Sequence, residues 1–406
     1  SFTQINNRKT YYLDAKLIET DRTNLSVYAN YRETENTFSE NQKALNSRVI
    51  YNQRLFKNFV TLGTRYETSS GNVAQQDFVY IEVEPGQGYY TWIDYNDNGI
   101  QEFDEFEIAE FQDQANFLRV PLPNLQFIAT QSAKINQSIT INASQWSTKK
   151  GLKKVLSHFY NQFFLSSNNE LKRTRNSFNL NPFKVNKEQQ ISVNFNIKNS
   201  LYFNRGLQNF STTYTYANAN NKQQYIIGNQ ATVTSYQQLE FQHLLGKFWL
   251  LDLQGKLSEN NLETENFNNR NYQINTYAFQ PKISYVLDNE NRFSAFYHIK
   301  DKKNDLADYE KLKQQKIGIE YFYQGKSRTQ FNANFTTFFN DFDGNPNSPV
   351  GYQMLEGLQE GTNYTWAFLW SKKLNSYLNL NLNYKGRKSL NSKTIHTGSI
   401  NLKAIF

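Results

Sequence analysis

Apolar and polar residues alternate with a period of two along much of the chain. In segment 378–385 leucines and a tyrosine alternate with asparagines and a lysine, and the same pattern recurs at 25–31, 191–198 and 331–335. Successive side chains of a β-strand point to opposite faces of the sheet. The pattern therefore predicts strands with one apolar and one polar face.

Both a soluble antiparallel sandwich and a membrane-spanning β-barrel produce this local alternation. The length and spacing of the strands distinguish these two folds. The predicted strands run to roughly 11–14 residues, against ~5–6 in typical soluble sheets. Their connections alternate between short and long, which is typical of outer-membrane barrels. Short turns are predicted near 135–138 and 166–171 among others, and long loops near 70–123, 147–154, 220–230 and 341–361.

These features predict an all-β fold: a transmembrane antiparallel up-and-down β-barrel of about 18–22 strands, with long extracellular loops and short periplasmic turns. The barrel would occupy residues 1–406, with 70–123 as a long extracellular loop insertion. Because bacterial barrels usually have an even number of strands, at least one strand is expected upstream of the first recognisable one. A final amphipathic strand that ends in Phe406 resembles the terminal strand of outer-membrane barrels.

The composition supports a protein that is polar inside and apolar outside. Aromatic residues make up 16% of the chain, yet only 38% of residues are hydrophobic and the mean hydropathy is −0.74. Disordered chains are poor in aromatic residues, and barrels carry aromatic girdles. No run approaches the ~18 apolar residues of a membrane-spanning helix. The absence of cysteine excludes disulfides and thiolate metal sites.

The net charge of +8 raises the question of nucleic acid, but the basic residues form no recognised binding motif, so no nucleic-acid partner is expected. Basic residues instead collect in predicted outer loops: Lys149, Lys150, Lys153, Lys154, Lys300, Lys302, Lys303, Arg387 and Lys388. We expect them either to pair with lipopolysaccharide phosphates beside the outer-membrane lipid or to be ordinary solvated loop charges.

The longest loop contains one sharp motif. Residues 94–105 fit the calcium-loop pattern D-x-[DN]-x-[DN]-G-x₅-E at every specified position. The predicted ligands for a structural Ca²⁺ ion are Asp94, Asn96, Asn98, the carbonyl of Ile100, Glu102 and Glu105. A strand before the motif and a short helix after it are expected. The alternative is a solvated loop rich in Asp and Asn.

The predicted loop at 341–361 contains an apolar cluster that includes Val350, Met354 and Leu355. Such a cluster in an external loop would fold into the lumen as a lid, meet a partner protein, or pack within its own loop.

Catalysis finds little support, because the four histidines are scattered and no nucleotide-binding or metalloprotease motif is present. We therefore expect a non-catalytic protein.

Two stretches resemble a known group of proteins. Segments 90–109 and 352–366, together with the terminal strand, are similar to the C-terminal β-barrel of large, largely uncharacterised outer-membrane proteins of Bacteroidota. The resemblance implies the cell outer membrane as location and a large region ahead of the barrel.

The sequence is compatible with two functions. The first is a membrane-embedded component of a multi-protein export, assembly or surface-display machine, with protein partners in the complex. The second is an outer-membrane channel or transporter, porin-like or TonB-dependent, for small molecules. Fold alone does not choose between them.

Overall fold

The computed structural model describes residues 5–37, 41–123, 127–173, 178–184, 186, 188–207, 209–288, 290–306, 308–325, 328–375, 377–390 and 392–404. Phe406, on which part of the terminal-strand prediction depends, lies outside these residues.

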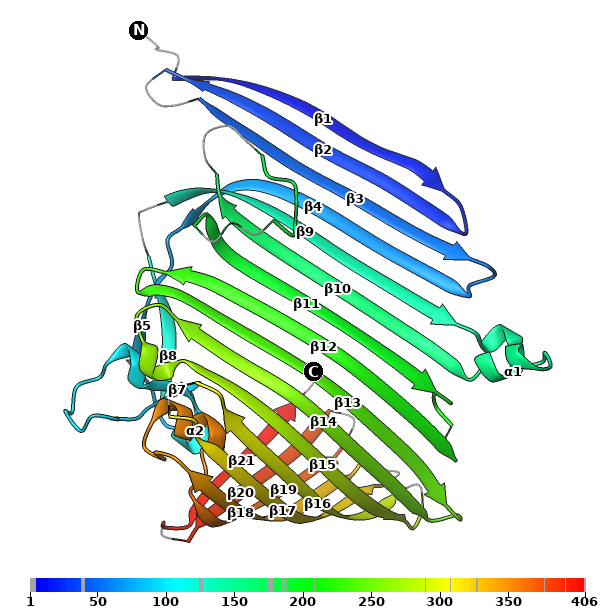
Figure 1. Cartoon of the computed structure of the whole chain (residues 1–406), viewed down its shortest axis with the longest axis vertical. Helices are drawn as coiled ribbons and strands as arrows, with labels where there is room; N and C mark the ends of the chain where they lie inside the picture. The colour runs from blue at the N-terminus through cyan, green and yellow to red at the C-terminus, as the bar shows by residue number, and fades with distance from the viewer. Residues whose placement is uncertain are drawn as a thin grey trace.

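Most of the described chain forms one large antiparallel sheet (Figure 1). Its 17 strands are β1 (Asn6–Glu19), β2 (Thr23–Asn36), β3 (Gln42–Leu55), β4 (Val60–Ala74), β9 (Phe127–Asn142), β10 (Phe159–Lys172), β11 (Gln190–Phe203), β12 (Phe210–Tyr225), β13 (Gly228–Leu245), β14 (Trp249–Thr264), β15 (Tyr272–Val286), β16 (Asn291–Asn304), β17 (Lys311–Gln324), β18 (Gln330–Asp343), β19 (Gly361–Lys373), β20 (Leu378–Ser389) and β21 (Ile395–Ala404).

A second, four-stranded sheet lies within the insertion between β4 and β9. It consists of β5 (Asp77–Glu82), β6 (Tyr90–Trp92), β7 (Phe106–Ile108) and β8 (Phe117–Leu122). Short helices occupy the connections: η1 (Phe103–Glu105), η2 (Gln112–Gln114), η3 (Ser144–Trp146), α1 (Leu152–Leu156), η4 (Asn268–Arg270) and α2 (Pro349–Leu355). No helix among the described residues is long and apolar enough to cross a membrane.

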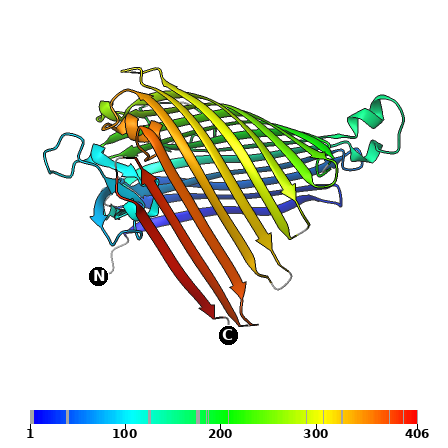
Figure 2. The ribbon, with the colours of Figure 1, turned by 90° about the horizontal axis from the view of Figure 1, so that it is seen from below.

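The large sheet follows an up-and-down order in which each strand pairs with the next, and β4 pairs with β9 across the insertion. The sheet curls round but does not close within the described residues: β1 pairs only with β2, and β21 only with β20 (Figures 1 and 2). The antiparallel all-β prediction is confirmed.

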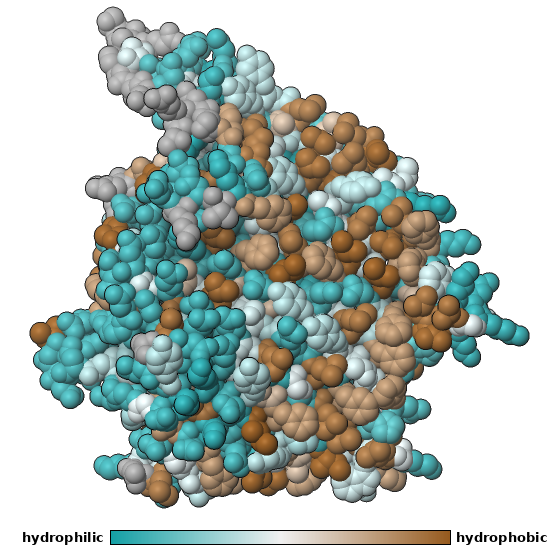
Figure 3. Space-filling view, in the orientation of Figure 1, coloured by the Kyte–Doolittle hydropathy of each residue, from teal (hydrophilic) through white to brown (hydrophobic). Residues whose placement is uncertain are grey.

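The two faces of the sheet differ in character. On β17, Ile317, Ile319 and Tyr321 point to one face and are exposed, whereas Leu312 and Gln314 point to the other and are fully buried. We call the first the outward face and the second the inward face. Figure 3 shows hydrophobic residues spread over the strands, and a hydrophilic region over the rim that carries the insertion. The predicted alternation is therefore confirmed in three dimensions.

Polar side chains on the inward face are paired across strands. Ser284 and Ser294 share a hydrogen bond of 2.8 Å, and Gln314 donates to Asn340 at 3.0 Å. Lys282 forms an ion pair with Glu320 at 2.5 Å. Buried polar groups need such partners to offset lost hydration, so these cross-strand pairs stabilise the polar part of the inward face.

The predicted range of 18–22 strands is too high for the described residues, because two predicted turns do not exist. The polar clusters at 135–138 and 166–171 lie inside β9 and β10. Their side chains bond to neighbouring strands instead: Ser166 donates to Asn136 at 2.7 Å and Thr64 donates to Gln137 at 2.6 Å. Asn and Ser signal a turn in a soluble protein, but here they belong to the faces of the large sheet.

The loss of these two turns also moves the segment near 147–154. It lies with η3 and α1 at the rim formed by the short turns, which we call the turn rim, opposite the insertion rim (Figure 1). Lys149, Lys150, Lys153 and Lys154 are therefore not in an outer loop beside the insertion. The predicted long loop at 220–230 is also wrong, since β12 and β13 join through a hairpin in which Tyr225 pairs with Gly228.

Candidate functional site

The insertion has its own aromatic core. Tyr80 stacks on Phe106 with ring centroids 3.9 Å apart, and Phe106 packs edge-on against Phe117. The guanidinium of Arg119 lies 4.9 Å from the centre of the Phe78 ring. Aromatic packing of this kind buries large apolar areas, so the insertion is a small folded unit.

The first half of the calcium-motif segment is a run of tight turns. Asp94 accepts hydrogen bonds from the backbone N–H groups of Asn98 and Gly99, at 3.1 and 2.7 Å. Asn96 accepts from Asn98 N–H at 3.0 Å, and Asn98 accepts from Ile100 N–H at 2.6 Å. Gly99 has a φ of 70°, a conformation that favours glycine.

The second half is organised around Glu105, which is only 1% exposed. Its carboxylate accepts from the Trp92 indole at 2.8 Å and from the N–H groups of Tyr95 and Glu102, both at 3.3 Å. Glu102 itself accepts from the Asn96 amide at 2.7 Å. The structure thus brings all six predicted ligand residues into one loop, and a calcium ion there stays a prediction.

The helix expected after the motif is wrong. Only the single turn η1 forms, and the chain then continues as β7, which pairs with β6. The arrangement is strand–loop–strand, because Phe106 faces the aromatic core of the insertion. No group of three or more His, Cys, Asp and Glu side chains in the described residues is placed to hold a metal ion.

The apolar cluster of the 344–360 connection folds onto the inward face of the large sheet. Val350, Met354 and Leu355 of α2 pack against Ile274, Leu312 and Phe342 from three strands. We call α2 together with residues 356–360 the lid. The cluster therefore packs on the sheet, and its action as a lid of a lumen stays a prediction.

Local sequence sets the limits of α2. Ser348 caps the helix by accepting from Gly351 N–H at 3.0 Å, and Pro349 occupies the first turn, where it loses no hydrogen bond. Glu356 and Gly357 then adopt left-handed φ values of 56° and 68° and end the helix.

Three lysines of the inward face converge on Glu356, and we call this group the lysine cluster. Glu356 Oε1 lies 2.5 Å from Lys300 Nζ and 2.9 Å from Lys302 Nζ, and its Oε2 lies 3.4 Å from Lys316 Nζ. Lys302 also donates to the Met354 carbonyl at 2.8 Å. Burial by itself raises the pKa of the Glu356 carboxyl, but the three lysines outweigh burial and hold this pKa below its usual range.

Lys300 and Lys302 were predicted to lie in an outer loop, either paired with lipopolysaccharide phosphates or solvated. That placement is wrong, because both lie within β16 and point inward to Glu356. Lys303, on the other face of β16, pairs with Asp305 at 2.5 Å.

The insertion is tied to the rim at several points. Glu107 pairs with Arg270 at 3.1 Å, and Asp113 pairs with Arg387 at 2.5 Å. The Tyr352 hydroxyl of α2 accepts from Glu110 N–H at 3.1 Å and donates to the Ile108 carbonyl at 3.2 Å. The lid and the insertion are therefore directly linked.

The carboxyl group of Glu107 has a strongly perturbed pKa. Its side chain is 3% exposed, and burial raises its pKa to about 7, although Arg270 acts in the opposite direction. The carboxyl therefore titrates near neutral pH at the contact between insertion and rim.

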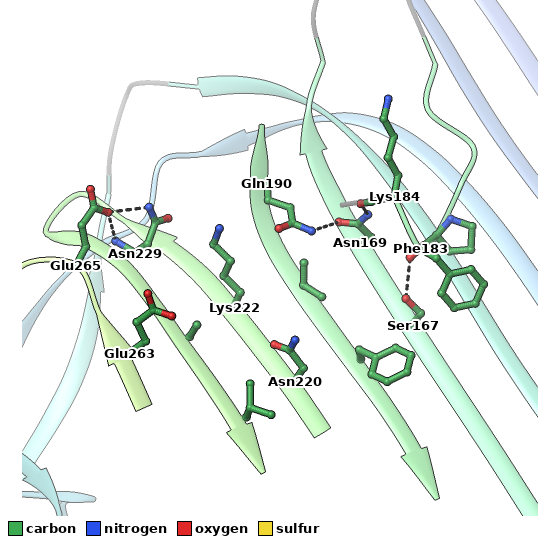
Figure 4. A pocket seen from close by; sticks show the side chains of 15 residues that line it. Ser167, Asn169, Phe183, Lys184, Gln190, Asn220, Lys222, Asn229, Glu263 and Glu265 are labelled. Atoms are coloured by element: carbon green, nitrogen blue, oxygen red, sulfur yellow. Dashed lines mark hydrogen bonds between the residues drawn. The ribbon is translucent and has the colours of Figure 1, made fainter. Parts of the chain in front are cut away.

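A separate hollow of about 620 Å³ lies on the outward face near the insertion rim (Figure 4). Residues 182–184 form one side of it, held by Ser167, which donates to the Pro182 carbonyl at 2.8 Å, and by Asn169, which donates to the Lys184 carbonyl at 2.7 Å. Phe195 and Val233 give it an apolar floor, and its polar lining includes both acidic and basic groups.

The sequence singled out the calcium-motif residues and the apolar cluster of α2, but it gave no indication of Glu356, Glu107 and Arg270. A lone Glu after an apolar helix carries no signal of its own. The two-residue spacing of Lys300 and Lys302 is that of two residues on one face of a strand, but their segment was interpreted as a loop.

Comparisons with known proteins add little. No family model and no curated protein matches the chain. A solved structure described as "Outer-membrane expressed OmpT of Vibrio cholerae" is similar at 10% identity and a TM-score of 0.29, covering 84% of this chain and 89% of that chain. A likeness at this level has no bearing on function.

Proposed function

We propose that the chain forms the wall of an outer-membrane β-barrel, and that it serves as the non-catalytic, membrane-embedded part of a multi-protein machine for export, assembly or surface display. The main support for a barrel is the distribution of side chains on the sheet, which is inverted relative to a soluble protein. Large apolar side chains such as Leu239, Phe279 and Ile317 are exposed on the outward face, whereas the inward face carries hydrogen-bonded polar side chains beside the apolar patch under α2. Water would penalise this arrangement and a bilayer favours it.

The open edges favour partners. Strands β1 and β21 each have one edge without a strand partner in the described residues. An unpaired backbone group costs several kcal/mol in hydrocarbon, so we expect further strands to pair with both edges. The insertion adds a folded platform at one rim, where protein partners of such a machine would bind.

A channel or transporter for small molecules is the second candidate. The lid, which packs on the inward face beside charged lysines, favours it, because a lumen that conducts needs a polar wall and a means of closure. In either case, a Ca²⁺ ion held by the 94–105 loop would stabilise the insertion, and basic rim residues such as Lys388 would meet lipopolysaccharide phosphates.

The two functions are separated by purifying the protein from its native outer membrane in gentle detergent and identifying bound proteins by mass spectrometry. Stoichiometric partners are the expected result. A lone barrel that conducts ions in planar bilayers would overturn the machine and favour the channel. Recovery of the protein in the soluble fraction, with no membrane association, would overturn both.

A further inference from the structure

We propose that the lysine cluster is a binding site for a small anion bearing a carboxylate or phosphate group, which Glu356 of the lid occupies as a tethered substitute, so that a free anion competes with Glu356 and releases the lid. The inference deepens the proposed function, since the lid acts on a lumen only if the sheet is a barrel wall.

The geometry is that of a preformed anion site. Lys300, Lys302 and Lys316 come from two adjacent strands and point to one spot on the inward face. Both oxygens of a single carboxylate are used, so the site holds the group by more than one contact. Strands hold such positions more rigidly than loops do.

The balance of charge explains why an anion is needed. Lys302 is only 7% exposed, and burying an ammonium group without a counter-charge is costly. With Glu356 withdrawn, Lys300 and Lys302 would keep Glu110 as a nearby carboxylate, and Glu110 lies on the insertion rather than on the wall. His298, also on the inward face of β16, faces Lys316 and Lys300 and adds no negative charge.

The Glu356 contact is the ionic attachment of the lid to the sheet, beside apolar packing and hydrogen bonds. Glu356 holds a left-handed φ of 56°, which disfavours a non-glycine residue, and the lysines supply the compensating interaction. Loss of the Glu356 contacts would leave the lid held by the apolar packing of α2, by the Tyr352 bonds and by donors to its backbone carbonyls: Lys302 to Met354, and Asn340 and Asn363 to Gln359.

A cysteine-labelling experiment on the full chain, folded in detergent, tests the inference. The chain has no cysteine, and the Met354 side chain of the lid is fully buried against the inward face, so Met354→Cys reports lid opening through its rate of reaction with a polar maleimide. Glu356→Gln should raise this rate at least about tenfold. Glu360→Gln, an exposed carboxylate in the same connection, should leave it unchanged.

Inorganic phosphate serves as the probe, with chloride at equal ionic strength as the control. Phosphate should raise the labelling rate of Met354→Cys, and an added Lys302→Gln should abolish the phosphate dependence. Direct binding is measured by ³¹P line broadening, which should be stronger in Glu356→Gln protein, where the competitor is gone, than in wild type.

Three results would overturn the inference. Labelling that responds to Glu356→Gln but not to phosphate would mean that Glu356 holds the lid closed but that the lysine cluster binds no free anion. Equal phosphate effects with and without Lys302 would point to non-specific salt effects. An unchanged labelling rate in every variant would mean that Glu356 does not hold the lid closed either. Because the assay needs neither membrane nor partners, its failure is distinct from failure of the proposed function. Heat-modifiable migration on gels confirms that each variant is folded.

Discussion

At the residue scale, close packing makes particular positions intolerant of small changes. Gly386 of β20 lies under the Trp366 indole, and a Cβ at this position would overlap the ring. Trp366 also donates to the Tyr384 hydroxyl at 3.3 Å, and Tyr384 bonds His396 at 2.8 Å. A methyl group would therefore displace a ring that belongs to a small network across three strands.

We expect Gly386→Ala to lower the free energy of unfolding by about 1–3 kcal/mol through overpacking. The measurement is urea unfolding of the protein folded into lipid vesicles. Gly255→Ala on β14 is the matched control, because no described atom lies within 4 Å of its added Cβ. Equal stability of the two variants would show that the Trp366 ring moves without cost.

Glu107 makes the contact between insertion and rim depend on pH. Its folded-state pKa of about 7 lies above the ordinary value of 4.5, so the folded protein binds more protons between these two pH values. The contribution of Glu107 to stability is therefore greatest below about pH 4.5 and is lost as pH rises through about 7, by up to ~3 kcal/mol.

The measurement is the free energy of unfolding of the insertion across pH 4.5–8, reported by the fluorescence of a label attached to the insertion. Glu107→Gln should flatten the Glu107 part of the pH dependence. An unchanged profile in that variant would mean that Arg270 keeps the carboxylate charged throughout.

At the element scale, the 94–105 loop combines a motif read from sequence with a strand–loop–strand setting that only the structure gives. Because its turns bring oxygen-bearing side chains into one short segment, we expect the wild-type protein to bind one Ca²⁺ ion there. Asp94→Asn should weaken binding by on the order of tenfold or more, since it removes a ligand charge.

Isothermal titration with Ca²⁺ measures this effect. Asp97→Asn is the matched control: it removes one charge from the same loop at a position that the motif leaves unspecified. Similar losses in both variants, or no calcium binding in wild type, would identify the segment as a solvated loop.

At the scale of the whole molecule, the two faces of the sheet should tolerate charge very differently. Phe279→Arg places a charge on the outward face, and we expect it to cost about 2–4 kcal/mol if it lies near the bilayer midplane. Gln280→Arg, one residue further along β15, points inward and should have little effect.

Folding yield into vesicles, judged by heat-modifiable migration, compares the two variants. The same low yield for both, or a Phe279→Arg protein that folds normally, would contradict a lipid-facing outward face.

The sequence by itself determined the strand type, the alternation and the composition of the two faces, because a period of two is a local property of an extended chain. It also located the 94–105 motif, in which all predicted ligands lie within twelve consecutive residues. Both depend only on neighbours along the chain.

The tertiary structure alone decided the strand number, the rim to which each connection belongs, and the partners of the charged residues. Asn136 and Ser166 could be assigned to strands only once cross-strand pairing was known. The ion pairs of Glu356 with Lys300, Lys302 and Lys316 could be identified only once the lid was placed on the inward face. These contacts link residues up to 56 positions apart, and register and loop packing, which local pattern does not specify, bring them together.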